Sequence, residues 1–138
     1  MNIDSINNGI VIDHIKAGSG MKLYDLLGLG SLECSVAIIK NVHSQKMGKK
    51  DIIKIDAEIP IDIDAIGYVD PNATVNIIKD GELVEKKDID LPKRLVNVLK
   101  CKNPRCIVSV EQELPNIFIL SDKNLKEYRC MYCETKAE

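Results

Sequence analysis

The sequence predicts an α+β protein made of two parts, and three observations support this. The 138 residues contain 20 isoleucines, whose β-branched side chains favour strands. Strand-like and helix-like segments alternate as far as residue 90. Four of the five cysteines then lie after residue 100, where the segments become shorter. We therefore expect one domain over residues 1–90 and a second over residues 91–138.

The segments up to residue 90 fit the order β-α-β-β-α-β-β, which is the split βαβ (ferredoxin-like) plan with two helices and one extra strand. Strands are expected where apolar residues are β-branched or alternate, and helices where they recur every three or four residues. Asp80-Gly81 is a strong signal for a two-residue hairpin. The expected strands are residues 9–15, 33–42, 51–59, 73–79 and 82–89, and the expected helices are residues 20–29 and 62–69, the second ended by Asp70-Pro71.

Beyond residue 100 the cysteines form two close pairs. Cys101 and Cys106 have four residues between them, Cys130 and Cys133 have two, and 23 residues separate the pairs. Two short-spaced pairs at this separation are typical of a tetrahedral zinc site. An iron–sulfur centre, disulfides or free thiols are the alternatives. Four thiolates leave no position for a reactive water, so we expect one structural zinc ion per chain, without a catalytic role.

The residues around these cysteines favour the short strands of a zinc ribbon. They are residues 107–111, 117–120 and 125–129, while Leu-Pro-Lys-Arg (91–94) is expected to join the two domains. A segment of about 38 residues cannot bury enough apolar surface to fold alone, so the metal would hold it together. Cys34 stands apart from the pairs and is most simply a small buried hydrophobic residue.

The composition excludes several classes of protein. Hydrophobic residues make up 45% and charged residues 29%, which argues against disorder. The net charge of −2 removes the broad attraction expected of a general nucleic-acid binder. No apolar run approaches the roughly 20 residues of a membrane span, and the first residues lack the pattern of a secretory signal. We expect a cytoplasmic protein that binds neither nucleic acid nor membranes.

No catalytic set is evident in the sequence. The two histidines, His14 and His43, share no motif with a nucleophile, and no GxSxG, HExxH or phosphate-loop motif is present. Asp13-His14 is either a polar pair at a strand end or a ligand contact. The lysines at 49, 50 and 54 form either a solvated face or a patch that attracts phosphates, and Lys86-Lys87 is a second lysine pair. We expect a protein that is not itself an enzyme.

Several segments, taken in order, resemble the regulatory chain of aspartate carbamoyltransferase. They are residues 9–15 (Gly-Ile-Val-Ile-Asp-His-Ile), 47–55 (Met-Gly-Lys-Lys-Asp-Ile-Ile-Lys-Ile), 72–76 (Asn-Ala-Thr-Val-Asn) and 91–101 (Leu-Pro-Lys-Arg-Leu-Val-Asn-Val-Leu-Lys-Cys), together with the cysteine pattern. The resemblance covers roughly residues 3 to 134. It implies an N-terminal allosteric domain that binds nucleotides and pairs with its twin, and a C-terminal zinc domain that contacts the catalytic chain.

The resemblance also implies the effectors and the polar residues that contact them. CTP would be a feedback inhibitor and ATP a competing activator of the first committed step of pyrimidine synthesis, with UTP as a further candidate. The holoenzyme would consist of catalytic trimers bridged by regulatory dimers. Asp13 and Lys54 would contact the ribose and base. His14 and Lys86 would contact the phosphates, assisted by Lys50.

The implied base pocket is completed by backbone groups and apolar walls. Backbone groups near Ile6, Asn76 and Ile78 would contact the base, and Val11 and Leu83 would form the walls. One other function class remains open, a zinc-ribbon protein that binds nucleic acid. The basic residues near the cysteines favour this class, whereas the net charge and the scarcity of aromatic residues count against it.

Overall fold

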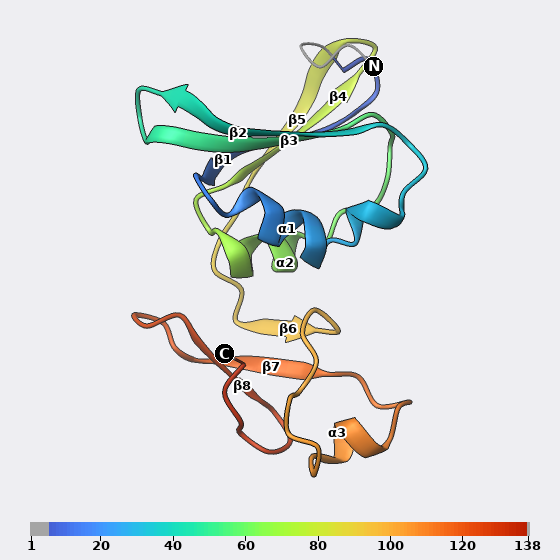
Figure 1. The fold of residues 1–138 in the computed structure, drawn as a ribbon, viewed down its shortest axis with the longest axis vertical. Helices are drawn as coiled ribbons and strands as arrows, with labels where there is room; N and C mark the ends of the chain where they lie inside the picture. Colours follow the sequence, from blue (N-terminus) through green and yellow to red (C-terminus); the bar gives the residue numbers. More distant parts are fainter. Residues whose placement is uncertain (1–5, 138) are drawn as a thin grey trace. The chain divides into compact units, whose positions relative to one another are not determined.

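The computed structural model describes residues 6–137, and the chain divides into two compact units between Leu91 and Pro92 (Figure 1). The first unit is built around a sheet and two helices, and the second around a smaller sheet. Each unit buries its own set of apolar side chains. None of the helices within residues 6–137 is long and apolar enough to cross a membrane.

The first unit is a five-stranded antiparallel sheet with two helices on one face (Figure 1). The strands lie in the order β2-β3-β1-β4-β5, so β1 is central and β2 and β5 are the edges. This is the predicted split βαβ plan, with β5 as the extra strand. In chain order the elements are β1 (Gly9–Lys16), α1 (Gly20–Leu26), the 3-10 turn η1 (Leu29–Ser31), β2 (Val36–Ser44), β3 (Gly48–Ile55), α2 (Ile63–Val69), β4 (Thr74–Lys79) and β5 (Glu82–Asp88).

Alternation along the central strands separates a buried face from an open face. Ile12 of β1 lies opposite Ile53 of β3 and Val75 of β4, and these three side chains are 0–2% exposed. Leu23 of α1 and Ile66 of α2 belong to the same buried cluster. Burying one such side chain contributes about 1.5–3 kcal/mol, so this isoleucine-rich layer is the main source of the unit's stability.

The hairpin and the end of the second helix follow the sequence signals. Asp80 and Gly81 have φ angles of 52° and 79°, as a two-residue type I′ turn requires. Helix α2 ends at Val69, directly before Asp70-Pro71, as predicted. It begins after Asp62, whose carboxylate accepts a hydrogen bond from the Ala65 N–H at 3.2 Å and thereby satisfies one of the free donors of the first turn.

Three elements in the first unit differ from the prediction by three residues or more at an end. Strand β2, expected over residues 33–42, runs from Val36 to Ser44. Helix α1 ends at Leu26 instead of residue 29, because Gly28 adopts a positive φ of 68° and begins the separate turn η1. Strand β3 was expected over residues 51–59 but runs from Gly48 to Ile55. Its first residues pair with the end of β2 in a hairpin, and after Ile55 the Asp56 N–H bonds the Ser35 carbonyl as the chain leaves the sheet.

The second unit contains the three-stranded sheet β6-β7-β8 and one helical turn. Leu95, Phe118 and Cys130 lie opposite one another across the three strands and are 0–1% exposed. They form the centre of a small buried layer, in the part of the chain where the sequence predicted a small domain around the cysteines. The elements are β6 (Arg94–Val96), α3 (Ile107–Val110), β7 (Ile117–Asp122) and β8 (Glu127–Cys130).

The second unit also differs from the prediction in two places. Residues 107–111 were expected as a strand but form the turn α3, in which the Ser109 N–H bonds the Cys106 carbonyl at 2.9 Å. The chain has to turn directly after Cys106, and this constraint outweighs the β propensity of the valines and isoleucine there. Residues 94–96, assigned partly to the junction, form β6, a three-residue strand that is defined by its pairing with β7.

A buried carboxylate joins three backbone segments of the first unit. Asp51 is 0% exposed, and its Oδ2 accepts hydrogen bonds from the Gly18 and Gly20 N–H groups, both at 3.0 Å. Its Oδ1 accepts a bond from the Asn41 N–H at 3.0 Å, at the irregularity in the pairing of β2 with β3. A side chain at Gly20 would meet Asp51 Oδ2 at 2.9 Å, so the first position of α1 requires glycine.

We expect Asp51→Asn to lower the free energy of unfolding of the first unit by about 2 kcal/mol or more. The amide presents one acceptor oxygen, so at least one buried N–H loses its partner, and hydrogen bonds to a charged group contribute roughly 1.5–3 kcal/mol each. Guanidinium denaturation followed by circular dichroism measures this loss. Asp56→Asn, at an exposed position after β3, is the control. Equal stability of the two variants would contradict the role given to Asp51.

Candidate metal centre and ligand-binding face

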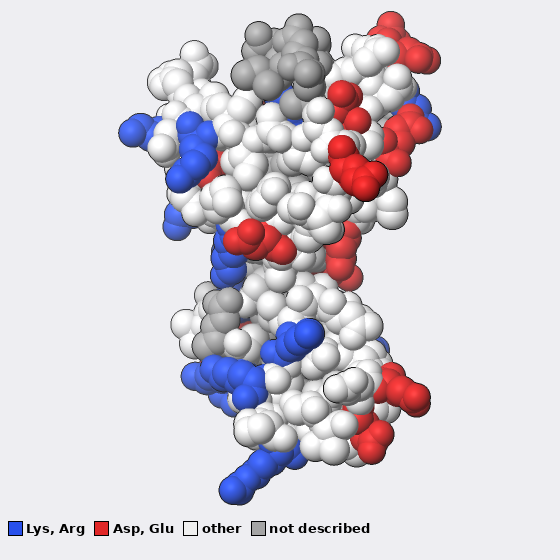
Figure 2. Space-filling model, turned by 45° about the vertical axis from the view of Figure 1, so that its right-hand side comes forward, with Lys and Arg blue, Asp and Glu red and all other residues white. Residues whose placement is uncertain are grey.

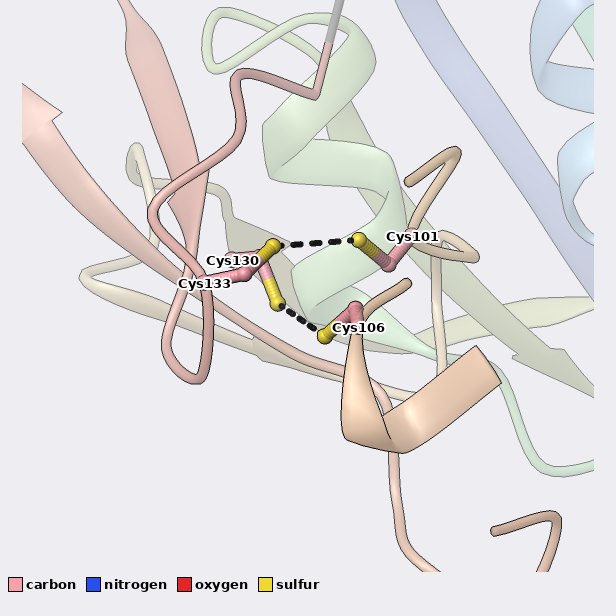
Figure 3. Close-up of side chains that lie close together, drawn as sticks. All are labelled: Cys101, Cys106, Cys130 and Cys133. Atoms are coloured by element: carbon pink, nitrogen blue, oxygen red, sulfur yellow. Dashed lines mark hydrogen bonds between the residues drawn. The ribbon is translucent and has the colours of Figure 1, made fainter. Parts of the chain in front are cut away.

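The four predicted cysteines converge in the second unit (Figure 3). Their sulfur atoms all lie within 4.8 Å of one another, with 3.6 Å between Cys101 and Cys133 and 3.7 Å between Cys106 and Cys130. A tetrahedral ion with metal–sulfur bonds of 2.3 Å requires sulfur atoms about 3.8 Å apart. The cluster therefore has the dimensions of a four-thiolate metal site. Cys34 lies in the first unit, packed against its core and apart from this cluster.

Backbone hydrogen bonds hold both cysteine pairs in tight turns. The Cys101 N–H donates to Asn116 Oδ1 at 3.0 Å, and the Cys106 N–H donates to the Asn103 carbonyl at 3.1 Å. In the second pair, the Cys130 N–H donates to the Thr135 carbonyl at 2.9 Å. These hydrogen bonds orient the two turns so that their sulfur atoms point toward one another.

Three of the thiols, those of Cys101, Cys106 and Cys133, differ in acidity. Burial raises the pKa of Cys101 to about 12 and also raises the pKa of Cys106. Hydrogen bonding to the side chain and backbone of Thr135 lowers the pKa of Cys133 to about 6. Cys133 is therefore the most acidic of these three thiols, and Cys101 and Cys106 would have to lose protons on binding a metal.

Most of the predicted nucleotide contacts lie on the open face of the first sheet. The pairing register places Lys54, Val11, Asn76 and Lys86 in one row across β3, β1, β4 and β5. Neighbouring rows on the same face hold Ile78 opposite Leu83, and Asp13 opposite Thr74. Residues that are far apart in the sequence are thus brought side by side, on the face away from the helices.

A pocket of about 370 Å³ opens on this face, within the size range of small-molecule sites. Five of the predicted residues line it, together with Ile52 and Gly81, which were not among the predicted residues. Ile52 has the same strand alternation as Lys54, which is the signal that could have revealed it. Among the described residues the lining consists of Ile6, Val11, Asp13, Ile52, Lys54, Ile78 and Gly81.

The other predicted residues surround this pocket without lining it. His14 lies at the irregularity in β1 with a φ of 58°, and its Nδ1 is 3.1 Å from Thr74 Oγ1. Lys50 forms an ion pair with Asp13, with 3.0 Å between Nζ and Oδ1. The remaining three, on β4 and β5, are Asn76, Leu83 and Lys86.

The two units carry opposite net charge. Residues 1–91 contain 15 acidic and 10 basic residues, whereas residues 92–138 contain 6 acidic and 9 basic residues. On the face drawn in Figure 2, acidic and basic side chains gather in separate patches on both units. An anionic ligand of the first unit must therefore be attracted by local lysines, because the net charge of that unit opposes it.

Comparisons with known proteins match both units. The family model described as "Aspartate carbamoyltransferase regulatory chain, allosteric domain" matches residues 1–90, and the model of the "metal binding domain" of the same chain matches residues 93–138. Three similar proteins are called aspartate carbamoyltransferase regulatory chain. That of Clostridium tetani is 52% identical, over 97% of this chain and 94% of its own length. Those of Clostridium acetobutylicum and Bifidobacterium longum are 48% and 41% identical, over 97% and 100% of this chain and 92% and 99% of their own lengths.

We expect the affinity of the cysteine cluster for a divalent metal to fall steeply as the pH falls. A free thiol has a pKa of about 8.5, and burial raises the pKa of Cys101 and Cys106 further, so at least two protons leave when the ion binds, and protons compete with the metal. Between pH 8 and pH 7 the apparent Kd should rise about 100-fold or more. Competition with a chromophoric chelator measures this change. A tenfold change or less would show that these thiols are already ionised.

Proposed function

This chain belongs to the family of aspartate carbamoyltransferase regulatory chains, and from this premise we propose how its two units work. It is an allosteric, non-catalytic chain. We propose that residues 1–90 bind the nucleotide effectors CTP and ATP, with UTP as a further candidate, and that residues 91–138 hold a structural zinc ion and contact the catalytic chain. Feedback control of pyrimidine synthesis would then pass from the first unit to the second. This assignment is preferred to the nucleic-acid-binding alternative because both units match the family.

The observation that carries the nucleotide proposal is the row of side chains across the open face. Lys54 and Lys86 lie in that row on different strands, and Asp13 lies beside it. Ammonium groups bind phosphate oxygens, and a carboxylate accepts hydrogen bonds from ribose hydroxyls. The pocket lined by Val11, Ile52 and Ile78 adds an apolar region for a base. These features support the assignment of ribose and base to Asp13 and Lys54, and of phosphates to Lys86 and His14.

Zinc is the metal that fits the cysteine cluster best. Four cysteine ligands at tetrahedral spacing are the arrangement of structural zinc sites, and such a site leaves no open position for a substrate. The second unit buries few large side chains, so the ion would contribute much of its folding free energy. We therefore propose that the metal controls association with the catalytic chain by keeping this unit folded. The need for reduced thiols supports a cytoplasmic location.

We also propose that two copies of this chain pair with each other. Edge strands with apolar side chains and free backbone groups favour pairing with another strand. Strand β2 is such an edge, since Ala37, Ile38 and Ile39 are half-buried apolar residues on it. The opposite edge, β5, is almost wholly exposed and carries charged residues of both signs. The β2 edge is thus the better candidate for contact between the allosteric domains of a regulatory dimer.

Replacement of Lys54 or Lys86 by Met should weaken CTP binding by about tenfold or more. A hydrogen bond to a charged group contributes roughly 1.5–3 kcal/mol, and either change removes one such bond. Isothermal titration calorimetry of the full chain measures the affinity. Lys87→Met is the matched control, because Lys87 adjoins Lys86 but lies opposite the buried Val75 and so belongs to the other face. If both variants bind CTP as wild type does, the site is wrongly placed.

Loss of the metal should abolish association with the catalytic chain while nucleotide binding persists. Cys130→Ala removes a buried ligand, and structural zinc supplies roughly 10–16 kcal/mol of apparent binding free energy in comparable small modules. Size-exclusion chromatography of this variant mixed with catalytic trimers, alongside a CTP titration, tests both parts. Cys34→Ala, which leaves the cluster intact, is the control. Co-elution of the Cys130 variant with the trimers would show that the metal unit does not form the contact.

A further inference from the structure

Lys50 and Asp13 form a two-point ion pair beside the pocket on the open face. Lys50 Nζ lies 3.0 Å from Asp13 Oδ1 and 3.2 Å from Oδ2, and the side chains are 16% and 22% exposed. Among the described residues, every other ion pair has at least one partner that is more than one-third exposed. A pair shielded in this way has a more defined geometry than a solvated surface pair.

The Asp13 carboxylate is also held from its own strand. The His14 N–H donates to Asp13 Oδ1 at 2.6 Å, which is possible because β1 is irregular here and His14 adopts a positive φ. One oxygen therefore has two partners, a backbone N–H and an ammonium, while Oδ2 is contacted by the ammonium. The carboxylate group is fixed in orientation with acceptor capacity remaining on both oxygens.

The pocket distinguishes the roles of the lysines on β3. Asp13 and Lys54 line it, whereas Lys50 is not among its lining residues within the described part of the chain. Lys50 contacts Asp13, and Asp13 in turn lines the pocket. Its ammonium charge is already compensated by the carboxylate, so binding a phosphate would require the ion pair to be broken or shared.

We propose that Lys50 is a positioning residue, which holds Asp13 ready to accept a hydrogen bond from a ribose hydroxyl, and does not bind phosphate itself. This inference rests on the proposed nucleotide site and changes the assistance with phosphates expected of Lys50 from the resemblance. A fixed acceptor makes the hydrogen bond without the entropy cost of ordering a mobile side chain. Lys50 thereby determines how strongly the site prefers ribonucleotides to nucleotides that lack the contacted hydroxyl.

The test compares the affinities of CTP, 2′-deoxy-CTP and 3′-deoxy-CTP by calorimetry on the full chain. In the Asp13→Asn variant, one of the two deoxy analogues should bind as tightly as CTP does. The hydroxyl that this analogue lacks is the one that Asp13 contacts. We expect Lys50→Met to reduce the preference for that hydroxyl about as much as Asp13→Asn does, and the double variant to reduce it no further. Because the preference is a ratio of two triphosphate affinities, the loss of one positive charge largely cancels from it.

Three comparisons make the result decisive. Lys50→Arg should restore most of the preference, because it keeps a donor group next to Asp13. Lys86→Met should weaken the binding of all three triphosphates equally, and Lys49→Met, at the exposed neighbouring position, should change neither affinity nor preference.

If Lys50→Met weakens the binding of CTP and of its deoxy analogues equally, Lys50 is a phosphate ligand and the proposal fails. An unchanged preference in Asp13→Asn also overturns it, while leaving nucleotide binding in place. Absence of CTP binding to the wild-type chain would instead overturn the proposed function.

Discussion

The pairing of β1 with both β3 and β4 determines most of what the first unit can do. This central strand sets the register that places Ile12 against Ile53 and Val75 on one face. The same register places Val11 between Lys54 and Asn76 on the other face. Because side chains alternate with a period of two, a slip by one residue would bury Lys54 and expose Ile53. The core and the proposed ligand-binding face are therefore products of one set of backbone hydrogen bonds.

The sequence predicts much of this arrangement, because the signals are local and strong. β-branched runs identify the strands, Asp80-Gly81 identifies the hairpin, and the cysteine spacing identifies the cluster. The elements that local sequence signals do not predict are determined by contacts between distant segments. Strand β6 has only three residues and exists through its pairing with β7. The helical turn at residues 107–110 contains valines and isoleucine that favour strands, yet the turn at Cys106 imposes its own backbone path.

In the candidate site, too, some features are predictable from the sequence and others depend on contacts between distant residues. The resemblance to a known family selected Asp13, Lys54, Ile6, Val11 and Ile78 of the pocket lining, whereas Ile52, on the same strand as Lys54, was not predicted. The ion pair of Lys50 with Asp13 could not be derived from spacing, since it spans 37 residues and depends on the irregularity in β1. The contacts of Asp51 with Gly18, Gly20 and Asn41 belong to the same category.

The shared register has a consequence for the energetics of the chain in the cell. A nucleotide at the proposed site would bridge β1, β3, β4 and β5 and would bind only to molecules in which all four strands are correctly paired, so binding and folding would be thermodynamically linked. Free ligand at 100 times its Kd would add about 2.7 kcal/mol to the free energy of unfolding of the first unit. The abundance of the regulatory chain would then follow the nucleotide pool through protection from proteolysis, in addition to any change of conformation that the effectors cause.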